Sequence, residues 1–179
     1  MDFPVDLVPF WLHAGHDRWF IRDDAFDREL RARFGEAHLR AARREFDGWS
    51  ATPDGALALV LLLDQVPRNI HRGSAHAFAT DGLARLFAAR ATDAGFDAKV
   101  DPALRIFLYM PFEHSEALAD QDRSIALVQA MGDPYYLRYA EAHRDAIVRF
   151  GRFPHRNAVL GRVNTPEEQA WLDTGGGFG

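Results

Sequence analysis

The stretch HRDAIVRFGRFPHRNAVLGRVNTPEEQAWL, from His143 to Leu172, contains the signals that decide the fold. Its first residues continue a helix that Gly151 is expected to end, because glycine tolerates the left-handed conformation that commonly follows a helix. Thr165, Pro166 and Glu168 then form the pattern of a capping box, in which two side chains satisfy free backbone N–H groups. The stretch therefore predicts a helix, a turn and a second helix.

Similar helix starts occur along the rest of the chain, where Thr or Asp precedes proline at Thr52-Pro53, Asp101-Pro102 and Asp133-Pro134. No run alternates apolar and polar residues between turns, so no strand is predicted. The expected fold class is all-α, with about seven helices of unequal length stacked as hairpins. The helices are expected at residues 3–13, 23–45, 53–66, 74–94, 101–109, 115–131, 134–150 and 165–173.

Composition narrows the class of protein. A chain of 179 residues favours one domain, here residues 1–179 with the last few frayed. The absence of cysteine excludes disulfides and thiolate metal sites, and the net charge of -5 argues against a nucleic-acid partner. The longest apolar run, Ala56–Leu63, is far shorter than the roughly 20 residues of a membrane span. With no basic N-terminal start, we expect a cytoplasmic protein without a membrane partner.

Two proline-containing segments carry most of the candidate binding residues. The segment Asp64–Asn69 (DQVPRN) parallels Gly151–Asn157 (GRFPHRN), and each is expected to end a helix, turn at proline and form one wall of a shared cleft. The candidate ligand-binding residues are Asp64, Gln65, Arg68, Asn69, Arg72, Gln121, Arg152, His155, Arg156, Asn157 and Arg162. Arginine forks suit a small anionic molecule or a peptide carboxylate. The alternative is that acidic side chains and backbone carbonyls pair these arginines internally.

A second hypothesis is an enzyme, a hydrolase or lyase, in which His143 or His114 acts as a general base beside Glu116. The competing interpretation of each histidine is a core residue bonded to a carboxylate or carbonyl. No zinc-binding spacing and no phosphate-binding glycine loop occur, so neither a metal nor a cofactor is predicted. A third hypothesis is a protein-interaction scaffold, and the oligomeric state stays open. The arginines of residues 28–44 are interpreted as a solvated, salt-bridged helix face.

Several motifs resemble a bacterial family known only as domain of unknown function 924. They are Phe10-Trp11, Arg18-Trp19-Phe20, Leu63–Asn69 with Arg72-Gly73, Met110–Glu116 with Gln121, and the run His143–Leu172. Val66 and Leu12 stand where the family usually has phenylalanine. The resemblance covers nearly the whole chain and implies a tetratricopeptide-like all-helical fold. It implies no known activity, cofactor or substrate.

Overall fold

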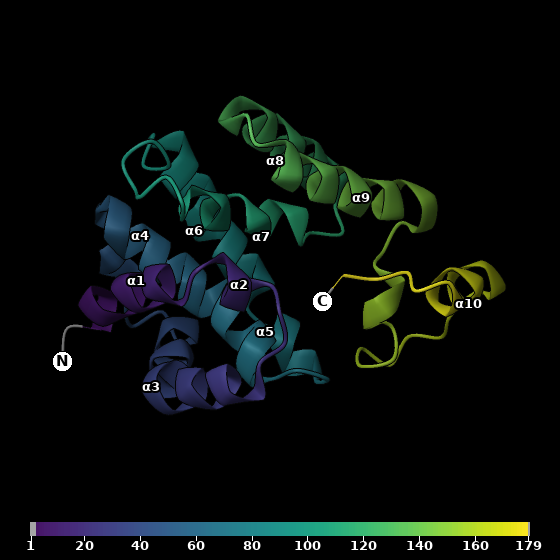
Figure 1. Cartoon of the computed structure of the whole chain (residues 1–179), viewed down its shortest axis with the longest axis horizontal. Coiled ribbons are helices and arrows are strands. Elements are labelled where there is room, and N and C mark those ends of the chain that lie inside the picture. Colours follow the sequence, from purple (N-terminus) through teal and green to yellow (C-terminus); the bar gives the residue numbers. More distant parts are fainter. Residues whose placement is uncertain (1–2, 179) are drawn as a thin grey trace. The chain divides into compact units, whose positions relative to one another are not determined.

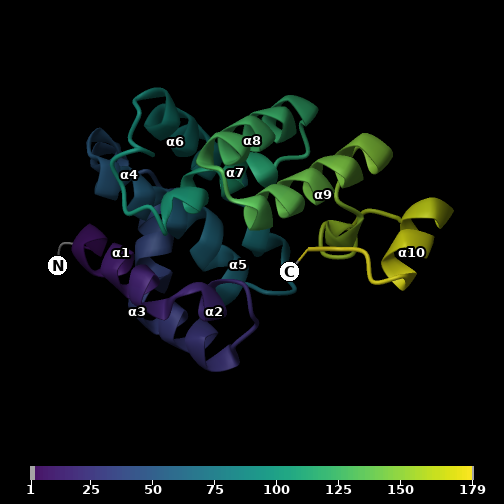
Figure 2. The same cartoon turned by 45° about the horizontal axis from the view of Figure 1, so that its top comes forward.

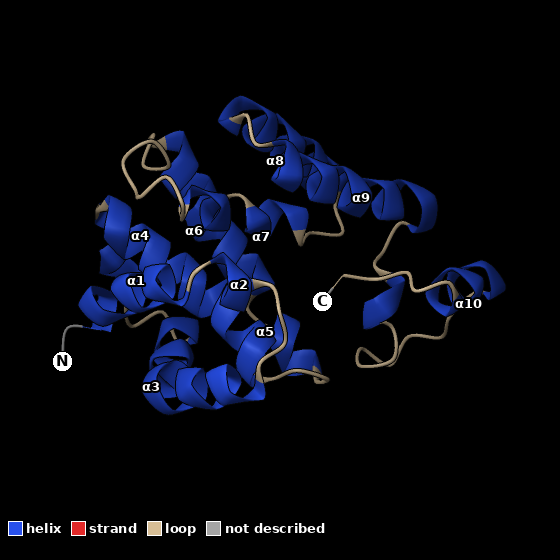
Figure 3. Cartoon of the chain, viewed as in Figure 1, coloured by secondary structure: helices blue, strands red, loops and turns tan. Residues whose placement is uncertain are grey.

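The computed structural model describes residues 3–178, and every regular element in them is a helix (Figure 3). This confirms the all-α fold class. Seven α-helices of eight or more residues lie in this part of the chain: α1 (Phe3–Ala14), α3 (Asp24–Ala42), α4 (Pro53–Val60), α6 (Asp81–Asp93), α8 (Leu118–Met131), α9 (Pro134–Phe150) and α10 (Pro166–Asp173). Shorter ones are α2 (His16–Trp19), α5 (Val66–Ile70) and α7 (Met110–Glu113). Within residues 3–178 no helix has the length and apolar character needed to cross a bilayer.

The chain divides into two compact units, which are described separately. Unit 1 comprises Met1–Arg72 and His76–Pro111, and unit 2 comprises Gly73–Ala75 and Phe112–Gly179. Figure 1 shows the helices of unit 1 in purple to teal and the long helices of unit 2 in green to yellow. The first candidate segment lies in unit 1 and the second in unit 2. That the two segments share a cleft stays a prediction, as does the tetratricopeptide-like form of the stack.

The centre of unit 1 is α4, whose residues 55–60 are all buried. It contacts α1, α6 and the 3-10 helix Asp47–Ala51. Thr52 caps it by accepting the Gly55 N–H, and Pro53 occupies its first turn, where the missing N–H costs nothing. The helix start predicted at Thr52-Pro53 is confirmed.

The predicted turn at Pro67 is wrong. The chain remains helical from α4 through a π-helical turn, Leu61–Gln65, into α5, and Pro67 lies inside this run. In an α-helix a proline ring collides with the carbonyl four residues earlier and leaves it without a donor. The π turn inserts one extra residue, so that the Val66 N–H reaches back to the Leu61 carbonyl, and it thereby accommodates the proline.

Side chains satisfy the backbone carbonyls that the π turn and Pro67 release. The Thr80 hydroxyl donates to the Leu63 carbonyl at 2.5 Å, and Leu63 stands four residues before Pro67. His38 Nδ1 donates to the Leu62 carbonyl at 2.8 Å. Because buried carbonyls without donors are costly, Thr80 and His38 stabilise a helix that the proline would otherwise break.

The helix expected from Ser74 begins later. A 3-10 helix spans Ala75–Phe78, and α6 starts only at Asp81. The Thr80 hydroxyl and the Asp81 carboxylate are both engaged with the π-turn region, which explains why the helix starts at this point. The buried face of α6 is formed by Ala84, Phe87, Ala88 and Ala91, whereas Leu86 on the same helix is exposed.

In unit 2, α8 and α9 form a helical hairpin and lie side by side in both views (Figure 2). Gly132 ends α8 in the left-handed conformation, and Asp133 caps α9 by accepting the Tyr135 N–H. The predicted bounds of α9 and its end at Gly151 are confirmed. Ser115 does not cap α8, which begins at Leu118, because its hydroxyl binds Asp120 and the Ala117 N–H.

Candidate functional site

Arg68, the central cation of the first candidate segment, binds acidic side chains of its own unit. Its two terminal nitrogens meet the Asp81 carboxylate at 2.9 and 3.0 Å, and Nη1 lies 3.1 Å from the Asp64 carboxylate. The Asp64 side chain is fully buried. Burial alone would lower the pKa of Arg68, but the Asp64 and Asp81 carboxylates raise it. Arg68 therefore acts as an internal tie between the π-turn region and α6.

The remaining predicted residues of that segment are also engaged with neighbours. Gln65 donates to the Asp64 carboxylate and to the Met110 sulfur, and Asn69 donates to the Gln65 carbonyl at 2.9 Å. Arg72 donates to the Asn69 amide oxygen at 2.6 Å. It also binds the Asp27 carboxylate of α3 at 2.6 Å. These contacts match the internal-pairing alternative of the sequence analysis.

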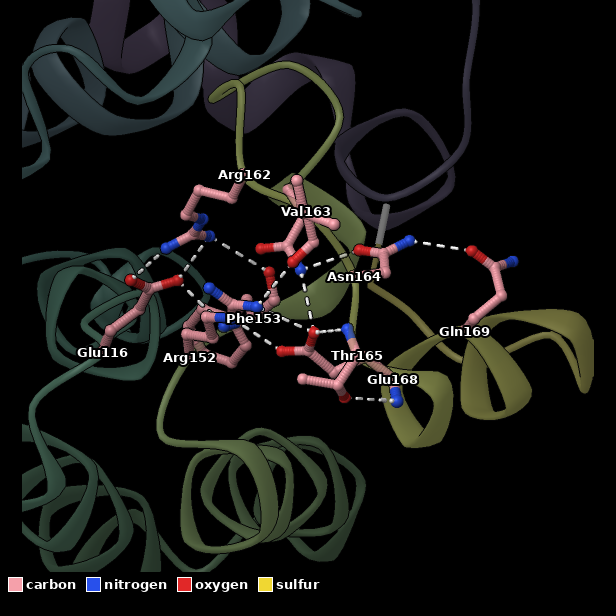
Figure 4. A network of polar contacts seen from close by, with 10 residues as sticks. Glu116, Arg152, Phe153, Arg162, Val163, Asn164, Thr165, Glu168 and Gln169 are labelled. Atoms are coloured by element: carbon pink, nitrogen blue, oxygen red, sulfur yellow. Dashed lines mark hydrogen bonds and ion pairs between the residues drawn. The ribbon is translucent and has the colours of Figure 1, made fainter.

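Two arginines, Arg152 in the second segment and Arg162 five residues after it, bind glutamates within unit 2 (Figure 4). Both terminal nitrogens of Arg162 donate to the Glu116 carboxylate, at 2.8 and 2.9 Å. Glu116 also accepts the Phe153 N–H at 2.8 Å. Burial alone would raise the pKa of Glu116, but the bonds from Arg162 and the Phe153 N–H lower it. Glu116 is thus an ionised structural anchor for the turn that follows α9.

Arg152 and Glu168 form the other half of this network (Figure 4). Arg152 meets the Glu168 carboxylate at 2.6 and 2.8 Å, and Glu168 completes the predicted capping box with Thr165. The Arg152 hydrogen bonds lower the pKa of Glu168 to about 2. The fully buried Asn157 donates to Asn164 at 2.8 Å. This network orders the loop between α9 and α10.

Gln121 plays a comparable part at the start of α8. Its side chain is fully buried, and its amide nitrogen donates to the carbonyls of Glu113 and Ser115, each at 2.6 Å. It therefore holds the connection between α7 and α8 in place. These hydrogen bonds offset the cost of burying a polar side chain on the inner face of the helix, where Ser124 and Val128 are also buried.

His143 lies on α9 and is only 6% exposed. Its Nδ1 is 2.8 Å from the Tyr139 carbonyl and 3.1 Å from the Glu113 carboxylate. Because a carbonyl can only accept, Nδ1 carries the proton and Nε2 keeps its lone pair. Burial lowers the pKa of His143 to about 3, and nearby positive groups add to this effect. The side chain is therefore a neutral imidazole with an accepting Nε2.

The predicted catalytic residues are brought together only in part. The rings of His114 and His143 lie 6.1 Å apart, between their centres. The carboxylate beside His143 belongs to Glu113, whereas that of Glu116 is bound to Arg162. Glu113 directly precedes His114 in the Met110–Glu116 motif and was not among the predicted catalytic residues. Within residues 3–178 no group of His, Asp and Glu side chains is arranged to hold a metal ion.

An aromatic cup, defined here as His143, Phe153, His155 and Trp171, surrounds the ring of Phe178. The rings of His143 and Phe178 are stacked, with centres 3.7 Å apart and planes 20° apart. The rings of His155, Phe153 and Trp171 follow at 5.7, 6.0 and 6.2 Å from Phe178. Residues 174–178 lead the chain from the end of α10 to the cup, and the predicted fraying of the last few residues stays a prediction.

Two glycines allow the tail to follow this path. A methyl group on Gly176 would lie 2.3 Å from the indole of Trp171, and one on Gly177 would lie 3.3 Å from His155. Gly177 also has a φ of +139°, which side chains rarely permit. Gly176 and Gly177 therefore allow the backbone path that places Phe178 against His143.

Comparisons with known proteins agree with these motifs. A family model described as bacterial protein of unknown function (DUF924) matches residues 7–176. The chain belongs to this family. A solved structure of a protein of unknown function from Agrobacterium tumefaciens is 51% identical, with a TM-score of 0.93, and the match covers 96% of this chain and 97% of that one. None of the curated proteins matches the sequence. The DUF924 assignment confirms the resemblance seen in the sequence.

Proposed function

We propose that the protein binds a small molecule with a planar heteroaromatic ring in the aromatic cup of unit 2. The observation that carries this proposal is the stacking of Phe178 on His143, at 3.7 Å between ring centres. A flat ring is thus already accepted at this position. Phe178 is half-buried, and residues 174–177 behind it are mostly exposed, so few contacts besides the ring hold the tail in place.

The chemistry of His143 narrows the class of ligand. Its neutral imidazole offers Nε2 as a hydrogen-bond acceptor, while Nδ1 is held by Tyr139 and Glu113. The Nε2 lone pair lies in the plane of the imidazole, so only an N–H or O–H group that projects beyond the edge of a ring stacked on His143 would satisfy it, and the phenyl ring of Phe178 carries no such group. We therefore expect indole-like or purine-like rings that carry such a group to be preferred over plain phenyl rings.

The anionic part of the predicted ligand is assigned to the side of the cup where Arg156 lies. Its guanidinium carbon is 4.5 Å from the centre of the Phe153 ring, and its positive charge contributes to the lowered pKa of His143. Arg156 also helps to lower the pKa of Glu116, whereas Arg152 and Arg162 bind glutamates directly and do not enter the proposal. A negative group on the ring would thus be favoured by Coulomb attraction.

Calorimetric titration with indole-3-carboxylate, adenine and benzoate tests the proposal. The wild type is expected to bind at least one heteroaromatic ring more tightly than benzoate. Phe178→Ala should bind it about tenfold more tightly if the tail occupies the cup for about nine-tenths of the time. Gly176→Ala, which displaces the tail but keeps Phe178, should have the same effect.

The matched control is Val148→Ala, which shortens an exposed side chain on α9. Its affinity should equal that of the wild type. If Phe178→Ala and the wild type both fail to bind any of the three compounds, or if His143→Phe binds them equally well, the proposal is wrong.

A second candidate, an enzyme, is favoured by the Glu113–His143 pair. A carboxylate that orients a neutral imidazole is the arrangement in which histidine accepts a proton from a substrate or water. Hydrolysis of p-nitrophenyl acetate and p-nitrophenyl phosphate by the Phe178→Ala variant provides the test. The enzyme hypothesis expects a rate above that of buffer which both His143→Phe and Glu113→Gln abolish, and it fails if the rates do not differ.

A further inference from the structure

A hollow in unit 1 is formed by α1, α2 and α3, which lie near one another in both views (Figures 1 and 2). Its volume is about 520 Å³, within the range of roughly 300–1,000 Å³ that small-molecule sites occupy. Phe10 from α1, Arg18 from α2, and Phe26, Glu29 and Arg33 from α3 line it. The α3 residues are spaced by three and four positions, which puts them on one helix face.

The apolar part of this hollow is a pair of stacked rings. Phe10 and Phe26 lie with centres 5.7 Å apart and planes within 6° of parallel. Phe26 is buried, whereas Phe10 is half-buried and accessible from the hollow. Aromatic rings favour such offset stacking, so a flat ligand can extend the pair.

The polar part consists of two guanidinium groups, those of Arg18 and Arg33, whose ion pairs within unit 1 are long. The Arg33 guanidinium lies 4.3 Å from the Phe10 ring centre, and its ion pair with Glu29 measures 3.4 Å. Arg18 lies 5.7 Å from the Phe26 ring centre and 3.8 Å from the Asp23 carboxylate. By contrast, Arg68 meets Asp81 at 2.9 and 3.0 Å.

We infer that this hollow binds a small aromatic carboxylate, with its ring against Phe10 and its carboxylate between Arg18 and Arg33. Two guanidinium groups line the hollow, and their carboxylate partners, Asp23 and Glu29, lie at the long distances of 3.8 and 3.4 Å, so an anion between the two arginines competes only with long ion pairs. The planar guanidinium fork matches a carboxylate, and replacing long ion pairs with short bonds to the ligand favours binding. The site differs from the aromatic cup in unit and residues, and it does not depend on the proposed function.

Titration of the protein with 2-naphthoate, followed by calorimetry and ligand-observed NMR, tests this inference. The full chain should bind 2-naphthoate. The double variant Arg18→Gln, Arg33→Gln should weaken binding about tenfold or more, because each charge-assisted bond contributes roughly that factor. The neutral analogue 2-naphthamide should bind about tenfold more weakly than 2-naphthoate, and added salt should reduce the binding of the carboxylate only.

Three control variants show whether 2-naphthoate occupies this hollow. Arg43→Gln removes one exposed arginine ten residues after Arg33 and should leave the affinity unchanged. Arg33→Lys keeps the charge but removes the fork, and should bind with intermediate affinity. Phe178→Ala should bind 2-naphthoate as the wild type does if the ligand occupies this hollow rather than the cup.

Three outcomes overturn the inference: no binding of 2-naphthoate to the wild type at millimolar concentration, equal affinity in the double variant, or tighter binding in Phe178→Ala that the double variant does not weaken. If the circular dichroism spectra of the Arg33→Lys variant and of the double variant match the wild-type spectrum, unfolding is excluded as the cause of lost affinity. Arg18 and Arg33 are exposed, so their substitution is expected to preserve the fold.

Discussion

The segments around Pro67 and Pro154 share a proline followed by arginine and asparagine, but their structures differ. Pro67 lies inside a continuous helical run that a π turn adjusts, whereas Pro154 follows a completed helix and begins a 3-10 turn. The difference is glycine. Gly151 adopts a φ of +70° and reverses the chain before its proline, while no glycine stands between Ala56 and Pro67. A proline alone therefore does not decide where a helix ends.

The two segments also use their arginines differently. Arg68 is enclosed and bridges Asp64 and Asp81 inside unit 1, whereas Arg152 and Arg162 lie nearer the surface and order a loop of unit 2. The first arrangement stabilises packed helices and the second stabilises an irregular connection. Four substitutions test these differences between the two segments and their units.

The largest effect is expected for Arg68→Ala, which leaves the carboxylates of Asp64 and Asp81 without their cation. Removing one partner of a buried ion pair typically costs about 3–5 kcal/mol of unfolding free energy. Urea denaturation followed by circular dichroism measures the loss. Arg43→Ala, in an exposed ion pair, should unfold at the same urea concentration as the wild type. Equal midpoints for the two variants would contradict the internal role of Arg68.

The next effect is a pH dependence that His143 gives to unit 2. Burial lowers the pKa of folded His143 to about 3, against an ordinary value of 6.5, even though the Glu113 carboxylate favours the charged form. The free energy of unfolding is therefore highest above about pH 6.5. It falls as the pH drops toward about 3, because the unfolded chain binds a proton that folded His143 does not bind. The slope is at most about 1.4 kcal/mol per pH unit, or about 2 kcal/mol between pH 6.5 and pH 5.

His143→Phe keeps a ring in the cup and removes the titrating group. Its unfolding free energy should vary less between pH 6.5 and pH 5 than that of the wild type. Denaturation curves at both pH values, together with NMR titration of the imidazole, provide the measurement. An imidazole that titrates near pH 6.5 in the folded protein would show that the burial of His143 does not control its charge.

A smaller effect is expected at Gly151, which ends α9 and has no counterpart in the segment around Pro67. Gly151→Ala places a side chain at φ +70° and should cost about 1–2 kcal/mol, through backbone strain alone because open space surrounds the added methyl group. Gly82→Ala adds the same methyl group within α6 and should be neutral or stabilising by up to about 1 kcal/mol. Thermal unfolding compares them, and equal shifts would refute the assigned role of Gly151.

The smallest effect is a coupling between Pro67 and Thr80. Thr80→Val should cost about 1 kcal/mol, because the Leu63 carbonyl loses its donor. In a Pro67→Ala background the new N–H can serve that carbonyl, so the same change should cost less. A double-mutant cycle measures the coupling. Additive free energies would mean that Thr80 does not replace the missing proline N–H.

Local signals predicted much of the fold. The bounds of α9, the caps at Asp23, Thr52 and Asp133 and the capping box at Thr165 depend on neighbouring residues only, and all were predictable. The π turn was not predictable in this way. It depends on donors from His38 and Thr80, which lie far from it along the sequence.

The candidate sites divide in the same manner. The sequence singled out His143 and the arginine-rich segments, but their partners Glu113, Asp81 and Glu168 come from other elements. Arg33 was interpreted as part of the solvated face of residues 28–44, and Arg18 was considered only as part of a family motif. Only the approach of α1 and α2 to α3 brings Phe10 beside Arg33 and Arg18 beside Phe26.

The amino-acid sequence by itself determined that this chain is helical, where most of its helices begin and end, and that it belongs to DUF924. Tertiary structure decided which charges are paired, which histidine is neutral and where the glycine-rich tail lies. These two groups of features differ in the distance along the chain over which their interactions act. Helix caps and chain reversals act over three or four residues, whereas burial and ion pairing depend on groups that only folding brings together.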